Sequence, residues 1–124
     1  MRGRKRKRIR EGARLPYADR AGIDPAKLKD YVLNPDASDK AQGFARELGI
    51  TREDWRFLHD QLLERVSYCE AVNARIPGSD RLEFTVLIPV DGRNGERRII
   101  STAWSVDSRR EPWFVTAWVT AKSA

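Results

Sequence analysis

The sequence contains very little of what marks several large protein classes. In 124 residues there is one cysteine, Cys69, one histidine, His59, and one methionine. A single cysteine cannot form an intramolecular disulfide, and one cysteine with one histidine cannot supply the four ligands of a structural zinc site. No apolar run is long enough to cross a bilayer, and no signal-peptide pattern is present. We therefore expect a cytoplasmic protein with no metal, no cofactor and no membrane association.

Several catalytic motifs are missing as well. The chain has no glycine-rich phosphate loop, no paired-histidine metal motif and no nucleophile elbow. These absences exclude the common nucleotide-binding, metalloprotease and serine-hydrolase patterns. The length is sufficient for one small domain with its own core and too short for two.

The positive charge is concentrated at the N-terminus. Residues 1–14 hold eight basic side chains and one acidic one, a net charge of +7, so the remaining chain is close to neutral. The basic residues are Arg2, Arg4, Lys5, Arg6, Lys7, Arg8, Arg10 and Arg14. Such a run repels itself and buries nothing, which predicts a disordered tail over 1–14 and a single domain over 15–124. The tail is either a solubilising extension or a contact for nucleic acid, which counterion release would favour.

The first half of the chain beyond the tail reads as helices. Asp24-Pro25 predicts a helix start, and Asn34-Pro35 predicts its end. A second helix follows, capped by Asp36 or Ser38 and stopped by Gly49. Thr51 with Asp54 resembles a capping box, and the apolar spacing after it predicts a third helix from about residue 52 to 73.

The second half changes to the two-residue period of strands. Alternation predicts a strand over 82–90, and the Asp91-Gly92 and Asn94-Gly95 turn dipeptides predict a hairpin to a second strand over 97–106. A third strand is expected over 113–120. The predicted fold class is thus α+β in a single domain, with three N-terminal helices before a three-stranded, or four-stranded, antiparallel meander.

A short repetition links the last two strands. Thr102-Ala103-Trp104 recurs as Thr116-Ala117-Trp118. Within each copy the threonine and the tryptophan share a sheet face. If the strands pair, two hydroxyls and two indoles could gather on one surface, either as a site or as cross-strand pairs that only stabilise the sheet.

At this point the sequence resembles an uncharacterised bacterial domain family, whose members occur as C-terminal payloads of polymorphic toxins or as small proteins beside a short partner gene. The resemblance spans residues 15–120. It rests on Leu15-Pro16, Ala21-Gly22-Ile23, Lys27-Leu28, residues 31–35, Lys40-Ala41, Phe44, Leu48-Gly49-Ile50, the Gly92 to Gly95 turn, Thr102-Ala103-Trp104 and Val115-Thr116-Ala117.

The resemblance implies a helix-then-sheet layout similar to the barnase, EndoU, colicin and RelE group of small ribonuclease toxins. It also implies a small antitoxin or immunity protein as a partner. The sequence departs from the family pattern at residues 36–39, where a histidine and a glycine are usual and neither is present. A member without that histidine could have lost the chemistry while keeping the fold.

Metal-free RNA cleavage needs a base, an acid and groups that bind the phosphate. We expect Lys40, at the start of the second helix, to be a catalytic or phosphate-binding residue together with the hydroxyls of Thr102 and Thr116. The indoles of Trp104 and Trp118 are candidates for stacking unpaired bases. Each of these residues also has an ordinary structural interpretation, as a solvated lysine, a sheet threonine or a core tryptophan.

Other reactive side chains fit the predicted structure without a catalytic role. His59 lies on the flank of the third helix and is expected to be structural. Cys69 falls on the apolar stripe of that helix, and no partner that would activate its thiol is adjacent. The arginine doublets Arg97-Arg98 and Arg109-Arg110 fit solvated strand ends, or a clamp on phosphates.

Three hypotheses follow. The first is a toxin-like, metal-independent ribonuclease that acts on RNA rather than DNA, with the basic tail raising the local substrate concentration. The second is a non-catalytic nucleic-acid-binding module with the same fold. The third is a module that binds only a protein partner.

Overall fold

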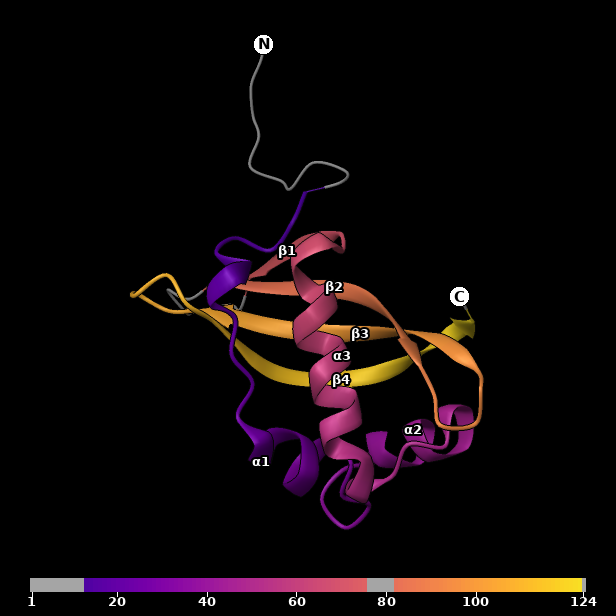
Figure 1. Cartoon of the computed structure of the whole chain (residues 1–124). Helices are drawn as coiled ribbons and strands as arrows, with labels where there is room; N and C mark the ends of the chain where they lie inside the picture. The colour runs from indigo at the N-terminus through magenta and orange to yellow at the C-terminus, as the bar shows by residue number, and fades with distance from the viewer. Residues whose placement is uncertain (1–12, 76–81, 124) are drawn as a thin grey trace.

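The computed structural model describes residues 13–75 and 82–123, which form one α+β domain with a four-stranded antiparallel sheet (Figure 1). The helical elements are η1 (Ala18–Arg20), α1 (Pro25–Lys27), η2 (Leu28–Val32), α2 (Lys40–Leu48), η3 (Arg52–Asp54), α3 (Trp55–Arg65) and η4 (Val66–Tyr68). The strands are β1 (Ala71–Arg75), β2 (Leu82–Asp91), β3 (Arg97–Val106) and β4 (Pro112–Ser123), in the spatial order β1-β2-β3-β4.

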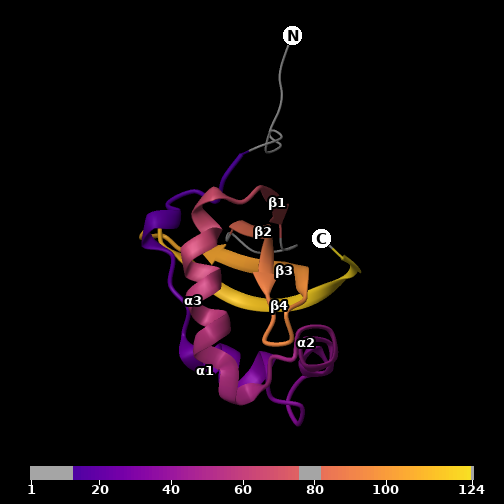
Figure 2. The same cartoon turned by 45° about the vertical axis from the view of Figure 1, so that its right-hand side comes forward.

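The predicted fold class is confirmed in outline, with two differences. The helices occupy the middle of the chain rather than its N-terminus, and the sheet has four strands. Figures 1 and 2 show α3 lying across one face of this sheet, while α1 and α2 lie beyond β4. None of the helices in the described ranges is long and apolar enough to cross a membrane.

Local signals set the helix ends that the sequence predicts. The Asp24 carboxylate accepts the N–H of Ala26 at 3.0 Å, and the helix that starts there continues as a π-helical turn to Val32. The Ser38 hydroxyl accepts the N–H of Lys40 at 3.0 Å, so serine caps α2. Gly49 adopts a left-handed conformation, with φ of 65°, after the last residue of α2.

The prediction for the third helix is wrong at its C-terminal end. The α-helix stops at Arg65, and the segment from Ala71 is strand β1, which pairs with β2 in the register Ala71↔Val86. The apolar stripe of α3 continues through Val66 and Cys69, both buried, so its period alone gives no stop signal. Pairing with β2 supplies backbone hydrogen bonds and buries Ala71, and this outweighs the helix propensity of the alanines and arginine in the segment.

The boundary of the predicted tail also shifts. The carbonyl of Ala13 accepts the N–H of Ala71 at 2.9 Å, and Arg14 forms an antiparallel bridge with Glu70. These two residues therefore belong to the folded domain, beside the start of β1. Residues 1–12, which carry the rest of the predicted tail, lie outside the described residues.

The β2–β3 turn joins the sheet to the helical half. The Leu48 carbonyl at the end of α2 accepts the N–H of Arg93 at 2.8 Å, and the Asn94 side chain donates to the Glu47 carbonyl at 3.3 Å. A Cβ on Gly92 would lie 2.4 Å from the Leu48 carbonyl oxygen, so only glycine permits this approach. The turn thus caps the C-terminus of α2.

Candidate functional site

The three residues expected to form a catalytic centre do not converge. Thr102 is fully buried on the sheet face that packs against the helices, where its hydroxyl donates to the Val86 carbonyl at 2.8 Å. Thr116 pairs with Ala103 in the register of β3 and β4, so it lies on the opposite face. A substrate phosphate cannot contact both hydroxyls, and the sequence hypothesis of a joint site is wrong on this point.

The reason is the strand register. Thr102 lies directly opposite Ala117, and Ala103 lies opposite Thr116. The two copies of the Thr-Ala-Trp repeat are therefore offset by one residue, and directly opposed residues share a face. Each copy keeps its threonine and tryptophan together, but the copies face opposite ways.

Lys40 lies apart from both threonines, at the N-terminus of α2. Its ammonium donates to the Tyr31 hydroxyl at 3.1 Å and lies 5.1 Å from the centre of that ring. Both residues line a pocket of about 380 Å³ that also includes Ser38 and the acidic residues Asp36 and Asp39. The tyrosine contact gives this lysine a structural partner, and the two carboxylates make the pocket a poor site for a phosphate.

The two predicted stacking residues have different environments. Trp104 is fully buried, its indole N–H donates to the Thr102 hydroxyl at 2.7 Å, and its ring meets that of Phe114 edge-on at 5.6 Å. It is a core residue and cannot stack a base, so that prediction is wrong. Trp118 is 39% exposed and lies on the other face of the sheet, where stacking remains geometrically available.

The sheet face that bears Trp118 has no helix packed on it among the described residues, and we call it the uncovered face. Three of its rows run across β2, β3 and β4 in register: Leu87, Ser101 and Trp118; Thr85, Ala103 and Thr116; and Glu83, Ser105 and Trp113. Val72 of β1 lies beside Thr85. The β3 side chains are all small, and each has a larger side chain on either side.

Several large apolar side chains are exposed on the uncovered face. Val72 is 57% exposed, Leu87 43% and Trp113 45%. Contiguous exposed apolar side chains on a monomer typically mark an interaction surface. This face is therefore the strongest candidate for a functional site in the described part of the chain.

Sequence reasoning missed Trp113, which the structure holds in a fixed position. Gly22 forms a parallel bridge with it, in which the N–H of Gly22 donates to the Pro112 carbonyl and the N–H of Phe114 donates to the Gly22 carbonyl, both at 3.0 Å. The indole packs so closely on Gly22 that a Cβ there would lie 2.8 Å from a ring carbon of Trp113. One side of the ring is thus covered by backbone.

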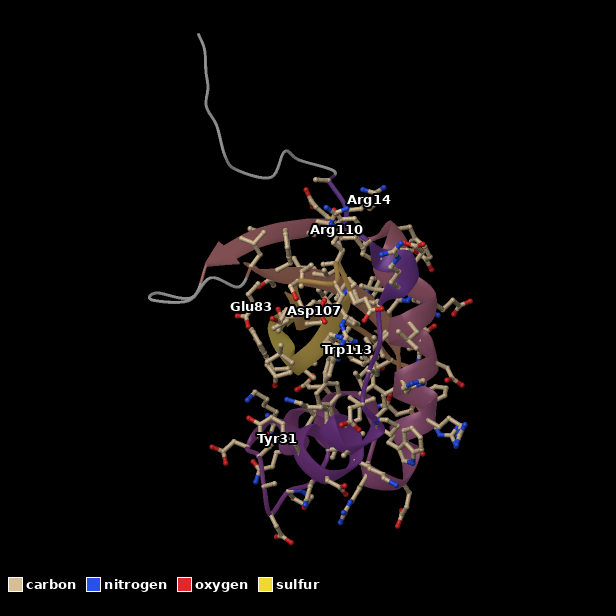
Figure 3. The ribbon with its side chains drawn as sticks, turned by 90° about the vertical axis from the view of Figure 1, so that its left-hand side faces the viewer. Arg14, Tyr31, Glu83, Asp107, Arg110 and Trp113 are labelled. Atoms are coloured by element: carbon tan, nitrogen blue, oxygen red, sulfur yellow. The ribbon has the colours of Figure 1, made fainter. Side chains whose placement is uncertain are left out.

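Asp107 lies beside the Trp113 indole. Its carboxylate accepts the backbone N–H groups of Glu111 at 3.0 Å and Arg109 at 2.9 Å, and the nearby indole N–H also favours its charged form. These hydrogen bonds lower the pKa of Asp107 below its ordinary value of 3.8. Figure 3 shows Asp107, Glu83 and Trp113 at this end of the sheet, with Arg14 and Arg110 near its top and Tyr31 in the helical part below.

A β-bulge brings Trp113 to the same face as Trp118. The register shifts between Ala103 and Trp104, so that Val115 has no opposite residue on β3. Strict alternation along β4 would place residues 113 and 118 on opposite faces. The extra residue reverses the alternation, which puts Phe114 into the core and Trp113 outside.

The remaining candidate residues have structural contacts. His59 lies beside the Trp55 ring, with 5.8 Å between ring centres, and contacts Asp60 at 2.9 Å. Cys69 is buried, and that burial raises the pKa of its thiol, which makes it a poor nucleophile. Within the described ranges, no three His, Cys, Asp or Glu side chains are placed to hold a metal ion.

The predicted phosphate clamps are occupied by carboxylates at one strand end. Arg97 pairs with Asp91 at 2.9 Å, and Arg98 pairs with Glu47 and Glu96 at 3.2 and 3.0 Å. Arg109 and Arg110, in the β3–β4 turn next to Trp113, are exposed. The predicted contacts from Arg2 to Arg10 lie outside the described residues.

A helical layer on one face of a four-stranded antiparallel sheet, with two partly exposed tryptophans and no helix of the described residues on the other face, defines a small two-layer α+β domain. Residues 14–121 match the family described as Domain of unknown function (DUF6883), and the chain belongs to this family. Because the match begins at Arg14, the basic residues 2–10 lie outside the family domain. No curated protein and no solved structure matches the chain.

Proposed function

We propose that this domain binds single-stranded nucleic acid, RNA rather than DNA, on the uncovered face. The observation that carries the proposal is the position of Trp113, whose indole packs on Gly22 and lies beside Asp107 while 45% of the residue stays exposed. A held, half-exposed indole loses little side-chain entropy when a base stacks on it. Such stacking contributes about 1–3 kcal/mol per base.

The shape of the face also supports a planar ligand. The β3 positions beside the two tryptophans are Ser105 and Ser101, so no large side chain of the central strand rises next to either indole. Unpaired bases are flat and stack on the exposed face of a ring, which needs no contact with the two buried serines. Protein partners, in contrast, usually require a larger matching surface.

The basic segment enters the fold next to this face. Ala13 is hydrogen-bonded to Ala71, and the next residue, Val72, belongs to the uncovered face. The sheet is about 14 Å wide from β1 to β4, and twelve residues of chain can span up to about 40 Å. The cations of residues 2–10 can therefore reach the phosphates of a strand bound along β4, where they would supply sequence-independent affinity.

The geometry favours binding without cleavage. Thr102 is sealed in the core, Thr116 lies on the uncovered face, and Lys40 is paired with Tyr31. General acid–base cleavage needs such groups within hydrogen-bonding reach of one phosphate. We therefore expect no degradation of total RNA by the purified protein, with or without EDTA. Cleavage would restore the ribonuclease hypothesis and assign it to other residues.

The binding experiment compares two exposed aromatic residues. Wild type, Trp113→Ala and Tyr68→Ala are titrated against fluorescently labelled single-stranded RNA and DNA, and the anisotropy is measured. Tyr68, 56% exposed in η4, serves as the matched control because it follows α3 rather than a strand of the uncovered face. We expect Trp113→Ala to weaken RNA binding by about 5- to 100-fold and Tyr68→Ala to leave it unchanged.

A second arm tests the basic segment in the full-length chain. Replacing Arg2, Arg4, Lys5, Arg6, Lys7, Arg8 and Arg10 by glutamine should weaken binding and reduce its dependence on salt concentration. Equal affinity of wild type and Trp113→Ala would overturn the proposal. The wild type could instead associate with itself or bind a small antitoxin-like protein. If Trp113→Ala loses that association, the uncovered face binds a protein partner and not RNA.

A further inference from the structure

We infer that the uncovered face holds two base-stacking positions, at Trp113 and Trp118, that bind two bases of the same strand. This inference rests on the proposed function and adds to it a minimum ligand length and a direction of the bound strand along β4. The observations that carry it are the repeated arrangement around the two tryptophans and the bulge that brings them to one face.

The two positions share the same local plan. Trp113 lies opposite Ser105 on β3, and Trp118 lies opposite Ser101. In both cases the indole is on β4, the serine is on the neighbouring central strand, and a larger residue of β2 completes the row. Both tryptophans are partly exposed, at 45% and 39%. Two partly exposed indoles, each opposite a serine of β3 on the same face, point to a repeated function.

The bulge at Val115 places both tryptophans on the same face of the sheet. It adds one residue to β4 between the two indoles and so brings both to the uncovered face. A bulge leaves one residue of the ladder unpaired, which weakens the strand pairing locally. Here it also leaves Thr116 between the two indoles, with its hydroxyl oxygen buried and without a hydrogen-bond partner.

The spacing of the two positions sets the ligand length. Ser105 and Ser101 are four residues apart on β3. At about 3.3 Å per residue, the two rows are therefore about 13 Å apart along the strand. Stacked nucleotides advance about 3.4 Å each along a strand, so about four nucleotide steps connect the two indoles. A strand that reaches both must therefore run along β4, and a dinucleotide, which has only one step between its two bases, is too short.

Binding to both positions makes the second contact intramolecular, so affinity should rise steeply once the ligand can span them. The experiment measures the affinity of full-length wild type for single-stranded RNA from mononucleotide to octanucleotide, at a salt concentration high enough to suppress the basic segment. Tryptophan fluorescence quenching provides the signal. Wild type should gain about tenfold in affinity between the dinucleotide and the hexanucleotide.

Trp118→Ala should lose this gain, so that the hexanucleotide binds it no more tightly than the dinucleotide binds wild type. Trp118→Phe keeps a stacking ring and should retain most of the gain, which separates stacking from a general disturbance of β4. A smooth increase with length in both wild type and Trp118→Ala would overturn the inference. If the affinity then rises smoothly with length but Trp113→Ala still weakens the binding of long RNA, the proposed function stands. Only the second stacking position, at Trp118, is then rejected.

Discussion

The indole of Trp113 lies directly against the backbone of Gly22, ninety-one residues earlier in the chain. The contact leaves no room for a β-carbon at residue 22, and two backbone hydrogen bonds beside it tie the Gly22 segment to β4. The loop before α1 and the last strand thus form one surface. The orientation of the exposed ring depends on a residue that carries no side chain.

Substituting Gly22 should move the indole without unfolding the domain. In Gly22→Ala the new methyl group would lie 2.8 Å from the ring, and because Trp113 is half-exposed, the ring can shift toward solvent. We expect a change in tryptophan emission, weaker RNA binding, and a free energy of unfolding lowered by no more than about 1 kcal/mol. Fluorescence, anisotropy and urea denaturation measure these three effects.

Gly43→Ala is the matched control for that substitution. A Cβ on Gly43, inside α2, would lie 3.7 Å from Val119, which is an ordinary contact distance. Alanine in a helix interior should stabilise the domain by about 0.5–1 kcal/mol and leave RNA binding unchanged. If the two variants behave alike in RNA binding, the position of Trp113 does not matter for the ligand.

Thr102 and Thr116 offer a second matched pair, because valine has nearly the same shape as threonine. Thr102→Val removes both the donor to the Val86 carbonyl and the acceptor of the Trp104 indole N–H. Two buried polar groups then lose their partner, which should lower the free energy of unfolding by about 1–3 kcal/mol. Urea denaturation measures the change, and RNA binding by the folded variant should stay normal.

Thr116→Val should have the opposite effect on stability. The Thr116 hydroxyl oxygen is buried without a partner, so removing it leaves no hydrogen bond broken and relieves an unfavourable burial. We expect the free energy of unfolding to stay the same or to rise by about 1 kcal/mol. A loss of stability comparable to that of Thr102→Val would mean that this hydroxyl has a partner in solution.

Gln61 joins α3 to the end of β2. Its amide donates to the Asp91 carbonyl at 3.0 Å and accepts the Asp91 N–H at 2.8 Å, while Arg65 bonds the Asp91 carboxylate at 3.1 Å. Gln61→Leu fills similar space but leaves both backbone groups unpaired, so it should destabilise the domain by about 2 kcal/mol. Gln42→Leu, at an exposed position of α2, should change stability by less than about 0.5 kcal/mol in the same urea experiment.

Asp107 should make the free energy of unfolding depend on pH. Its pKa is below the ordinary 3.8 because the N–H groups of Glu111 and Arg109 and the Trp113 indole favour the charged form. The stabilisation from this charge is therefore complete above about pH 5 and is lost as pH falls through the folded-state pKa. The stability difference between wild type and Asp107→Asn should be constant near neutral pH and shrink below about pH 4. A difference that does not change with pH would contradict this role.

Features that depend on near neighbours in sequence could be predicted. The Asp24 cap, the Thr51–Asp54 capping box and the Gly49 stop each involve residues within one helical turn, and all three are observed. The strand alternation within 82–106 was also readable, because the face of these strands that packs against the helices is mainly apolar. The start of β1 was predicted as the end of the third helix. Its strand structure depends on pairing with β2, and its own residues carry no strand pattern.

The site could be predicted only in part, for the same reason. The sequence treated Trp104 and Trp118 alike, and the one-residue offset that separates them depends on which residues of β3 and β4 oppose one another. No local pattern marks Val115 as the bulged residue, so strict alternation would have assigned Trp113 to the core. Gly22 beside a distant tryptophan is visible only once the chain is folded.

The hydrogen bond from Arg93 to the Leu48 carbonyl has a consequence for how the chain is made. A nascent polypeptide that has emerged only through α3 carries α1, α2 and α3, yet the C-terminus of α2 still lacks its cap and its apolar face still lacks the strands. We therefore expect the helices to complete their packing only after the β2–β3 hairpin has been synthesised.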